Sequence, residues 1–479
     1  MNLLPAFTLL VAAFPSATVP FTVEATEDAS SQFAGAPRLQ SFSFAQWKGR
    51  WVFIGGRMAG YHGVGGGMAD FLRADANREV WVVDTTTKPA RTYHVSLDKL
   101  PATLVPVKDQ WGATAQLSFQ DGAKLYIGGG YGQDSDGKWV TFPVISQIDL
   151  PQLIDGVMQG RLPPASIAYA QTPLVQSAGG DLIKLTDGYF YVVMGHTFQG
   201  SYTAFEGQGG HNSKSASQEY LNEIRKLKIT SGGPGQLLVT LEDRFREQAE
   251  FHRRDFNLAH ILSPKGLGLA AYGGVFTPET QLSYSKPVYL FANFAPSVDS
   301  GFDQKMNAYT CAKMLIYDKS GETMYTTFFG GISRSTWDRA ARKFVENPKI
   351  GSKLAPVYLD GLQWSDQIST VRKVMAAGRE ATSEMVHLKE LPGFLGTNAV
   401  FIPSPELARA EPDTDILDLQ MLRGNRTFVG YVYGGIRAAP YKFPYLKTGA
   451  PYNAGTVPTK PSDLVLKVFI ETSGPRTSP

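Results

Sequence analysis

The 479-residue sequence predicts an all-β fold built from six similar sheets, and three observations lead to this prediction. Glycine is frequent, with 49 residues, against about 7% in an average protein. Aromatic residues make up 12% of the chain. Both enrichments are typical of short strands joined by tight turns. The third observation is an internal repeat, in which an apolar strand ending in glycines occurs six times.

Each repeat contains an aromatic-rich strand that ends in a pair of glycines. Residues 51–56 (WVFIGG) form the first copy, and the third copy is degenerate because it ends in Gly195-His196. The pairs or their equivalents lie at 55–56, 128–129, 195–196, 273–274, 330–331 and 434–435. Glycine suits the inner strands of a radial fold, where the backbones of neighbouring sheets approach closely.

The segments around the glycines complete a four-stranded unit. A strand and a tight turn precede them, as at Asp121-Gly122, a dipeptide typical of hairpins. Third strands are expected at 79–84, 144–149, 222–229, 287–291, 370–375 and 463–470, and fourth strands at 91–97 and 237–241. Antiparallel units of four strands repeated around an axis make a β-propeller, which leaves only short sheet edges exposed. We therefore predict a β-propeller with six blades.

The sixth unit has no candidate for its fourth strand after residues 463–470. Residues 20–25 (PFTVEA) alternate between apolar and polar positions and lie just before the first unit. We predict that this N-terminal strand joins the last blade and closes the ring. Residues 18–479 would then form a single domain.

The N-terminus carries a short apolar run at residues 3–14, which is too short to span a bilayer. Small residues follow it, so we predict a signal peptide at 1–17. A chain exported without disulfides fits a bacterial periplasm or exterior, and we expect no membrane span. Because no Lys or Arg precedes the run, an N-terminal strand of a cytosolic protein is the alternative.

Charge and cysteine content exclude several kinds of partner and site. A net charge of +3 does not favour nucleic acid or an anionic membrane surface as the main partner. Cys311 is the only cysteine, so an intrachain disulfide framework and a multi-cysteine metal cluster are excluded. No motif indicates a metal site or a cofactor, and we expect a monomer.

A long insert follows each glycine pair, at residues 57–78, 131–143, 197–221, 275–285, 332–369 and 436–462. In a four-stranded blade this connection leaves every sheet at the same end. We predict that the six inserts share one face, and long loops on a rigid scaffold are where binding residues usually lie. Within the fifth insert, the polar run 335–344 (STWDRAARKF) predicts a short surface helix.

Polar and aromatic side chains in and next to these inserts are the candidate ligand-binding residues. They are Arg57, His62, His196, Tyr202, His211, Arg253, Arg254 and Asp255. An adjacent acid holds an arginine in place, and arginines at the mouth of a channel suit a carboxylate, a phosphate or a sugar. Alternatively, these residues cap exposed carbonyl groups or pair with acids of a neighbouring blade.

Several phrases resemble a family of secreted bacterial kelch-like proteins of unknown function. They are residues 51–62 (WVFIGGRMAGYH), 195–202 (GHTFQGSY), 219–226 (EYLNEIRK), 253–257 (RRDFN) and 328–332 (FFGGI). The resemblance runs in order from about residue 37 to 470 and implies a kelch-type β-propeller and export. Many members carry a C-terminal sorting domain, which has no counterpart in this sequence. The resemblance implies no activity.

Two functions remain open. The first is an exported binding module for a glycan or a protein partner, which acts through the face with the long inserts. The second is a carbohydrate-active enzyme of epimerase, lyase or hydrolase type, with acid–base residues drawn from His62, His196, His211 and Arg254. A histidine or carboxylate within hydrogen-bonding reach of an arginine in a concave pocket would favour the enzyme. A flat face with scattered aromatic residues would favour the binding module.

Overall fold

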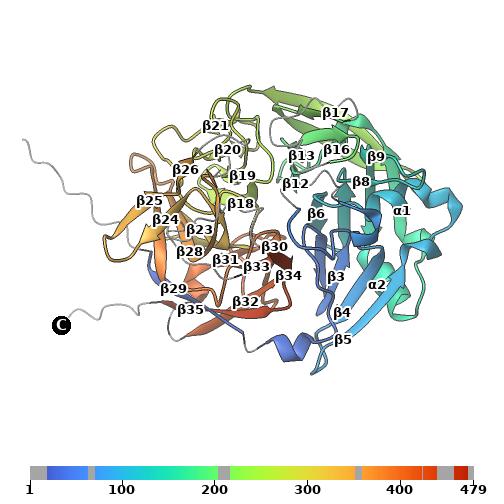
Figure 1. Cartoon of the computed structure of the whole chain (residues 1–479), viewed down its shortest axis with the longest axis horizontal. Coiled ribbons are helices and arrows are strands. Elements are labelled where there is room, and N and C mark those ends of the chain that lie inside the picture. Colours follow the sequence, from blue (N-terminus) through green and yellow to red (C-terminus); the bar gives the residue numbers. More distant parts are fainter. Residues whose placement is uncertain are drawn as a thin grey trace, which may run out of the picture.

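The computed structural model describes residues 19–27, 29–62, 71–202, 216–350, 359–422, 424, 426–439 and 458–472. Strands dominate these residues, and their sheets surround a central region in an all-β, propeller-like architecture (Figure 1). Only two α-helices occur in the described ranges, α1 (Val105–Trp111) and α2 (Leu150–Met158), both at the periphery. Neither of them has the length and apolar character that crossing a bilayer requires.

Antiparallel sheets follow one another along the chain, and we number them as units one to six. Unit one consists of β2 (Ser43–Trp47), β3 (Arg50–Ile54), β4 (Glu79–Asp84) and β5 (Arg91–Ser96). Unit four consists of β18 (Asn257–Ser263), β19 (Gly266–Tyr272), β20 (Val288–Phe291) and β21 (Ser297–Val298). Unit five consists of β22 (Lys313–Asp318), β23 (Thr323–Ser333), β28 (Gln363–Val374) and β29 (Ala381–Glu390), with β31 (Ile416–Asp418) parallel to β22.

Units two and three form one continuous sheet of eight strands. Unit two consists of β6 (Leu117–Asp121), β7 (Lys124–Gly128), β10 (Val144–Asp149) and β11 (Ile167–Gln171). Unit three consists of β12 (Asp181–Lys184), β13 (Phe190–Val193), β16 (Glu223–Gly233) and β17 (Gln236–Arg246). The outer strands β11 and β17 meet in parallel at Tyr169 and Gln236. Because the inner strands β6 and β12 also lie against each other, this sheet is nearly closed on itself.

The N-terminal strand completes unit six, which confirms the predicted pairing. Unit six consists of β30 (Ala399–Pro403), β32 (Thr427–Gly434), β35 (Val465–Thr472) and β1 (Phe21–Thr26). Strand β1 pairs antiparallel with β35, from Phe21 opposite Thr472 to Thr26 opposite Lys467. The alternating sequence of β1 buries Phe21 and Val23 in the core and leaves Thr22 exposed. The first and last parts of the described chain therefore share one sheet.

A ring of backbone hydrogen bonds joins the six units around their common axis. In each unit, the amide of a residue just before the inner strand donates to the carbonyl oxygen of the equivalent residue in another unit. The donor–acceptor pairs are Ser41 to Asn398 (3.3 Å), Ala115 to Ser41 (3.3 Å), Gly179 to Ala115 (3.1 Å), Asp255 to Gly179 (2.6 Å), Thr310 to Asp255 (2.7 Å) and Asn398 to Thr310 (2.9 Å). The chain of donors returns to its first member, so the ring is closed.

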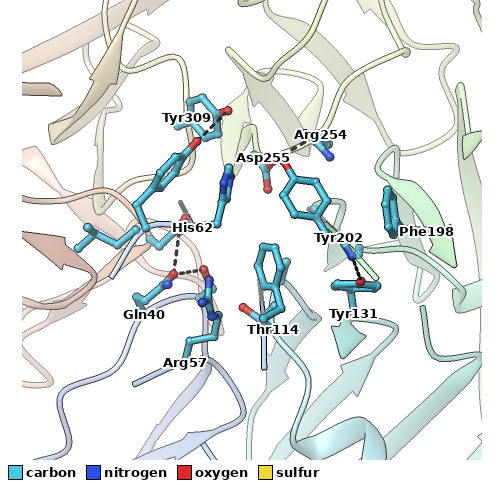
Figure 2. Close-up of a pocket in the computed structure, with 18 of the residues that line it drawn as sticks. Gln40, Arg57, His62, Thr114, Tyr131, Phe198, Tyr202, Arg254, Asp255 and Tyr309 are labelled. Carbon is cyan, nitrogen blue, oxygen red and sulfur yellow. Dashed lines mark hydrogen bonds and ion pairs between the residues drawn. The ribbon is translucent and has the colours of Figure 1, made fainter. Parts of the chain in front are cut away.

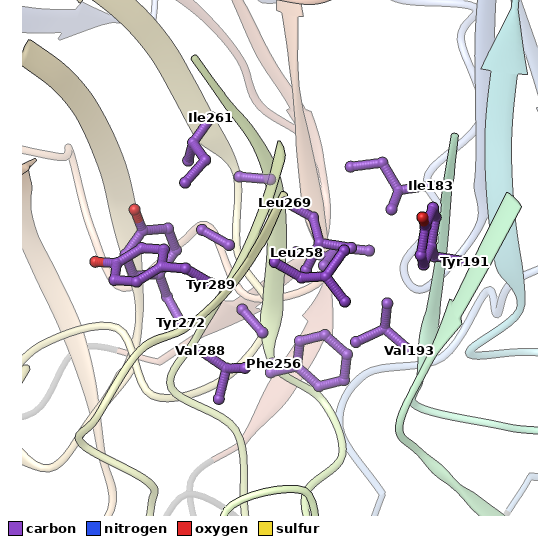
Figure 3. Packing of buried hydrophobic residues seen from close by; sticks show 14 of the residues in the cluster. Ile183, Tyr191, Val193, Phe256, Leu258, Ile261, Leu269, Tyr272, Val288 and Tyr289 are labelled. Atoms are coloured by element: carbon purple, nitrogen blue, oxygen red, sulfur yellow. The ribbon is translucent and has the colours of Figure 1, made fainter. Parts of the chain in front are cut away.

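Buried apolar side chains fill the space between neighbouring sheets. Figure 3 shows one such cluster, in which Leu258 and Leu269 of unit four lie between Tyr191 of unit three and the tyrosines Tyr272 and Tyr289. The second strand of each unit, which ends at the glycines, is largely buried on both faces and is correspondingly apolar. This packing makes the ring of sheets a rigid support for the inserts at its end.

Residues 335–346 form a β-hairpin, so the predicted helix at 335–344 is wrong. The hairpin consists of β24 (Ser335–Asp338) and β25 (Lys343–Glu346). The Trp337 and Phe344 rings pack edge to face across it, with centroids 4.9 Å apart. The Gln367 side chain of β28 accepts from the Trp337 amide at 2.8 Å and donates to its carbonyl oxygen at 3.0 Å. These tertiary bonds hold an extended backbone that the local polar pattern does not indicate.

Candidate functional site

A cavity lies at the axis of the ring (Figure 2), and its empty volume of about 730 Å³ includes space open to solvent. Residues of all six units line it, and five of the six ring residues are among them. They are Ser41, Ala115, Gly179, Asp255 and Asn398. The cavity therefore lies directly on the hydrogen-bonded ring, on the side from which the inserts extend.

The repeat determines which further residues reach this cavity. In units one to four the residue before the ring position pairs through its backbone with the residue that follows two positive-φ residues, as Gln40 does with Arg57 and Ala178 with His196. In units two and three these two residues are Gly129-Gly130 and Met194-Gly195, so the pairs expected at 128–129 and 195–196 are one residue out of register. The two paired positions occupy the same place in every unit, but their side chains differ. Arg57, Tyr131 and His196 are polar or aromatic, whereas Ile436 is apolar.

Arg254, Asp255 and His196 form a charged group in the wall of the cavity. The Arg254 Nε lies 3.5 Å from the Asp255 Oδ2, and the Arg254 Nη1 lies 3.4 Å from the His196 Nδ1. Only 11% of the Arg254 side chain is exposed, and its Nε is buried without a hydrogen-bond acceptor among the described residues. The Gln218 amide of β15 (Ser217–Tyr220) contacts the same His196 nitrogen.

The electrostatics of Asp255 follow from this position. Burial raises the pKa of the Asp255 carboxyl, and the neighbouring Arg254 guanidinium opposes that shift. The carboxylate is about 29% exposed and faces the cavity, so a ligand there could exchange a proton or a hydrogen bond with it. Gly179 leaves it room, because a Cβ at that position would lie 2.9 Å from the Asp255 Oδ1.

Aromatic side chains form most of the remaining wall. His62 stacks on Tyr61 at 4.2 Å between ring centroids and meets the edge of Tyr202 at 5.1 Å. Phe71 lies between Tyr131 and Tyr202, at 5.6 and 5.3 Å. These rings come from inserts of three different units, so their faces converge only in the folded chain.

Hydrogen bonds hold the aromatic inserts against one another. The Tyr131 hydroxyl donates to the Gly200 carbonyl oxygen at 2.7 Å and accepts from the Tyr202 amide at 3.0 Å. The Tyr61 and Tyr309 hydroxyls are 3.3 Å apart. These bonds link the inserts of units two and three on one side, and the insert of unit one with the segment leading into unit five on the other, which preorganises the cavity wall.

Arg57 occupies the wall between the aromatic and polar parts of the cavity. Its guanidinium lies 4.3 Å from the centroid of the Phe71 ring, and only 5% of the residue is exposed. Gln40 exchanges two backbone hydrogen bonds with Arg57 and donates from its side chain to the Gly60 carbonyl oxygen at 3.0 Å. Gln40 thereby holds the segment that carries Tyr61 and His62.

Six of the eight residues predicted from the sequence come together in this cavity. They are Arg57, His62, His196, Tyr202, Arg254 and Asp255. His211, the seventh, lies outside the described residues. Arg253 does not line the cavity, although it is adjacent to Arg254.

Arg253 is instead a fully buried structural residue. Its guanidinium pairs with the Glu250 carboxylate at 2.7 Å, donates to the Gly273 carbonyl oxygen at 2.9 Å and stacks on Tyr284 at 4.2 Å. Consecutive side chains of an extended segment point in opposite directions, so Arg253 and Arg254 cannot both reach the cavity. Burial lowers the pKa of Arg253 to about 10.

The sequence analysis missed several residues of the wall. Tyr131 follows a glycine pair, and Asn398 occupies the ring position of unit six, so a strict alignment of the repeats would have indicated both. Tyr309 directly precedes the ring residue Thr310, so the same alignment would have indicated it as well. Phe71 and Phe198 occupy no repeated position, and only the folded inserts bring them to the cavity.

Comparison with known proteins adds little. No model of a known protein family matches the chain, and no curated protein matches it. Among solved structures, the chain is similar to YjhT, with a TM-score of 0.43 and 12% identity. The similarity covers 83% of this chain and 91% of YjhT. We draw no conclusion about the site from a similarity this low.

Proposed function

We propose that the chain is an exported, six-bladed β-propeller of the kelch type that binds a saccharide in its axial cavity. The observation that carries this proposal is the convergence of aromatic faces with Arg254, Asp255 and His196 in one concavity. Small-molecule sites are concave, largely apolar or aromatic, and contain a few polar groups that fix orientation.

Saccharides combine the two chemistries that this wall offers. The apolar C–H face of a sugar ring can pack on Phe71 or Tyr202, whose rings line the cavity. Its hydroxyls donate to carboxylates and accept from guanidinium groups, so Asp255 and Arg254 together satisfy both directions of hydrogen bond. The concave shape favours such a small ligand over the flat surface of a folded protein partner.

A carbohydrate-active enzyme is the second candidate, and one observation favours it. His196 and the Asp255 carboxylate both lie within 3.5 Å of Arg254, inside the cavity. This is the arrangement that general acid–base chemistry on a sugar requires, and a carboxyl with a raised pKa is suited to proton transfer. In that role Asp255 would move the proton and Arg254 would stabilise developing negative charge.

The proposal is tested by screening the purified mature chain against a glycan array and measuring affinities of the hits by calorimetry. Arg254→Gln and Asp255→Asn should each weaken binding about tenfold or more, because each removes a hydrogen bond to a charged group. Arg437→Gln is the matched control, since Arg437 follows the cavity residue Ile436 and pairs with Asp463 at 3.1 Å outside the cavity. Binding unaffected by both cavity variants, or no glycan bound at all, would refute the proposal.

The saccharides that bind also distinguish the binding module from the carbohydrate-active enzyme. Incubation of the chain with each bound saccharide, followed by NMR, detects any product. Turnover that Asp255→Asn abolishes while binding persists would establish the enzyme. Binding without product in the native chain would establish the binding module.

A further inference from the structure

A second, smaller pocket adjoins the axial cavity, and we call it the side pocket; its empty volume of about 300 Å³ includes space open to solvent. Its lining residues are Arg57, Phe71, Arg73, Ala76, Arg78, Gly112, Thr114, Tyr131, Gly132 and Gln133. Four of them, Arg57, Phe71, Thr114 and Tyr131, also line the axial cavity. The two spaces therefore share one wall and form neighbouring compartments of the same face.

The side pocket differs from the axial cavity in its charge. Three guanidinium groups, those of Arg57, Arg73 and Arg78, line it, and no carboxylate occurs among its described lining residues. The axial cavity, by contrast, contains Asp255 beside Arg254. Three arginines around so small a space create a positive potential that favours an anion.

The contacts of Arg73 leave part of its donor capacity unused. Its Nη1 donates to the carbonyl oxygens of Gln133 (2.9 Å) and Asp134 (3.0 Å), which accounts for two of five N–H groups. Its Nη2 lies 3.9 Å from the Asp109 Oδ1, beyond hydrogen-bond length. Asp109 itself accepts from the amide and the hydroxyl of Ser135, at 2.9 and 2.6 Å. About a third of the Arg73 side chain is exposed.

Arg78 is also held by a neighbouring acid, but its positive charge is not neutralised. Its Nη2 lies 3.3 Å from the Asp98 Oδ1, and the Lys108 ammonium lies 3.0 Å from the same oxygen. Two cations thus share one carboxylate, which is itself 68% exposed and screened by solvent. Gly112 gives the guanidinium room, because a Cβ there would lie 3.2 Å from the Arg78 Nη1.

We infer that the ligand is an acidic saccharide, whose oxyanion enters the side pocket and is bound there by Arg73 and Arg78. This inference rests on the proposed function and adds to it the charge and the length of the ligand. A sugar ring in the axial cavity packs on Phe71, and the oxyanion that this ring or the next residue carries reaches the side pocket past Arg57. The oxyanion is a carboxylate or a sulfate ester, both of which accept two parallel hydrogen bonds from a guanidinium.

The experiment compares matched ligands by calorimetry on the full chain. The probes are neutral disaccharides, the same disaccharides with one ring oxidised to the uronate, and the same disaccharides carrying one sulfate ester. At least one acidic form should bind ten- to a hundredfold more tightly than its neutral parent. This preference should diminish as ionic strength rises, because the interaction is partly exposed.

Arg73→Gln and Arg78→Gln locate the effect in the side pocket. Each should reduce affinity for the acidic ligand about tenfold and leave affinity for the neutral parent unchanged. Arg50→Gln is the control. Arg50 pairs with Asp84, and the two side chains are 32% and 7% exposed, the same values as in the Arg73–Asp109 pair. Arg50 lies at the opposite end of β3 from the cavity. Thermal unfolding of all three variants verifies that they fold.

The outcomes are distinguishable. Equal affinity for neutral and acidic ligands, or an acidic preference that survives in Arg73→Gln and Arg78→Gln, would overturn the side-pocket inference and leave the proposed function standing. If the acidic preference is lost in the two variants, comparison of the uronate with the sulfate ester shows which oxyanion the side pocket prefers. If no saccharide of any charge binds, the proposed function fails and this inference fails with it.

Discussion

At the scale of single residues, the glycines of the repeat lie where neighbouring units touch. A Cβ built on Gly129 would lie 2.1 Å from the Ser177 carbonyl oxygen, which belongs to the segment leading into unit three. The backbone of Gly129 also has a φ of +57°, in the left-handed region. The residue therefore meets two separate requirements, a left-handed backbone and a close approach between units.

A matched pair of substitutions separates these requirements. Gly122 has the same φ of +57°, but no atom lies within 4 Å of its hypothetical Cβ. Gly122→Ala should cost only the backbone strain, about 1 kcal/mol of unfolding free energy. Gly129→Ala should cost about 3 kcal/mol or more, because the units must also move apart. Chemical denaturation of both variants measures the difference, and equal costs would contradict close contact at Gly129.

At the scale of elements, strand β1 (Phe21–Thr26) ties the two ends of the described chain together. Phe21 is 3% exposed, meets Tyr325 of unit five edge to face at 5.4 Å and stacks on His387 at 6.1 Å. Glu24 lies on the same strand, but its carboxylate pairs with Lys389 and Arg426 at the surface. The strand is therefore held by apolar burial against unit five as well as by its pairing with β35.

Phe21→Ala should lower the unfolding free energy by about 3 to 5 kcal/mol, the usual cost of removing a buried phenyl ring. Glu24→Gln is the control on the same strand and should cost about 1 kcal/mol or less, since exposed ion pairs contribute little. Thermal and urea unfolding of both variants provide the measurement. A Phe21→Ala variant as stable as the native chain would mean that β1 is not needed to hold the last sheet.

At the scale of the whole molecule, the ring of six backbone hydrogen bonds links every unit to its neighbours. No unit can leave the ring without breaking two of these bonds, and the ring residues also support the cavity. The units should accordingly unfold together rather than one at a time, in contrast to linear repeat proteins.

Hydrogen exchange with residue-level fragmentation and mass spectrometry tests this cooperativity. The amides of the six ring residues should exchange slowly and with similar opening free energies, because each opens only when the ring opens. The Gly137 amide, which donates within an exposed hairpin turn, is the fast-exchanging reference. In Phe21→Ala all six ring amides should lose protection together. Loss of protection in unit six alone would show that the units open independently.

The sequence by itself determined the strand-rich architecture, the four-stranded repeat and the use of the N-terminal strand, because each rests on local chemistry that repeats along the chain. It also indicated Arg57, His196 and Arg254, which occupy or adjoin repeated positions. Only the tertiary structure decided that residues 335–346 form a hairpin and that Arg253 is buried while Arg254 faces the cavity. It alone brought Phe71, Arg73 and Arg78 beside the cavity. Inserts have no period, and their positions depend on contacts between distant segments that no local pattern encodes.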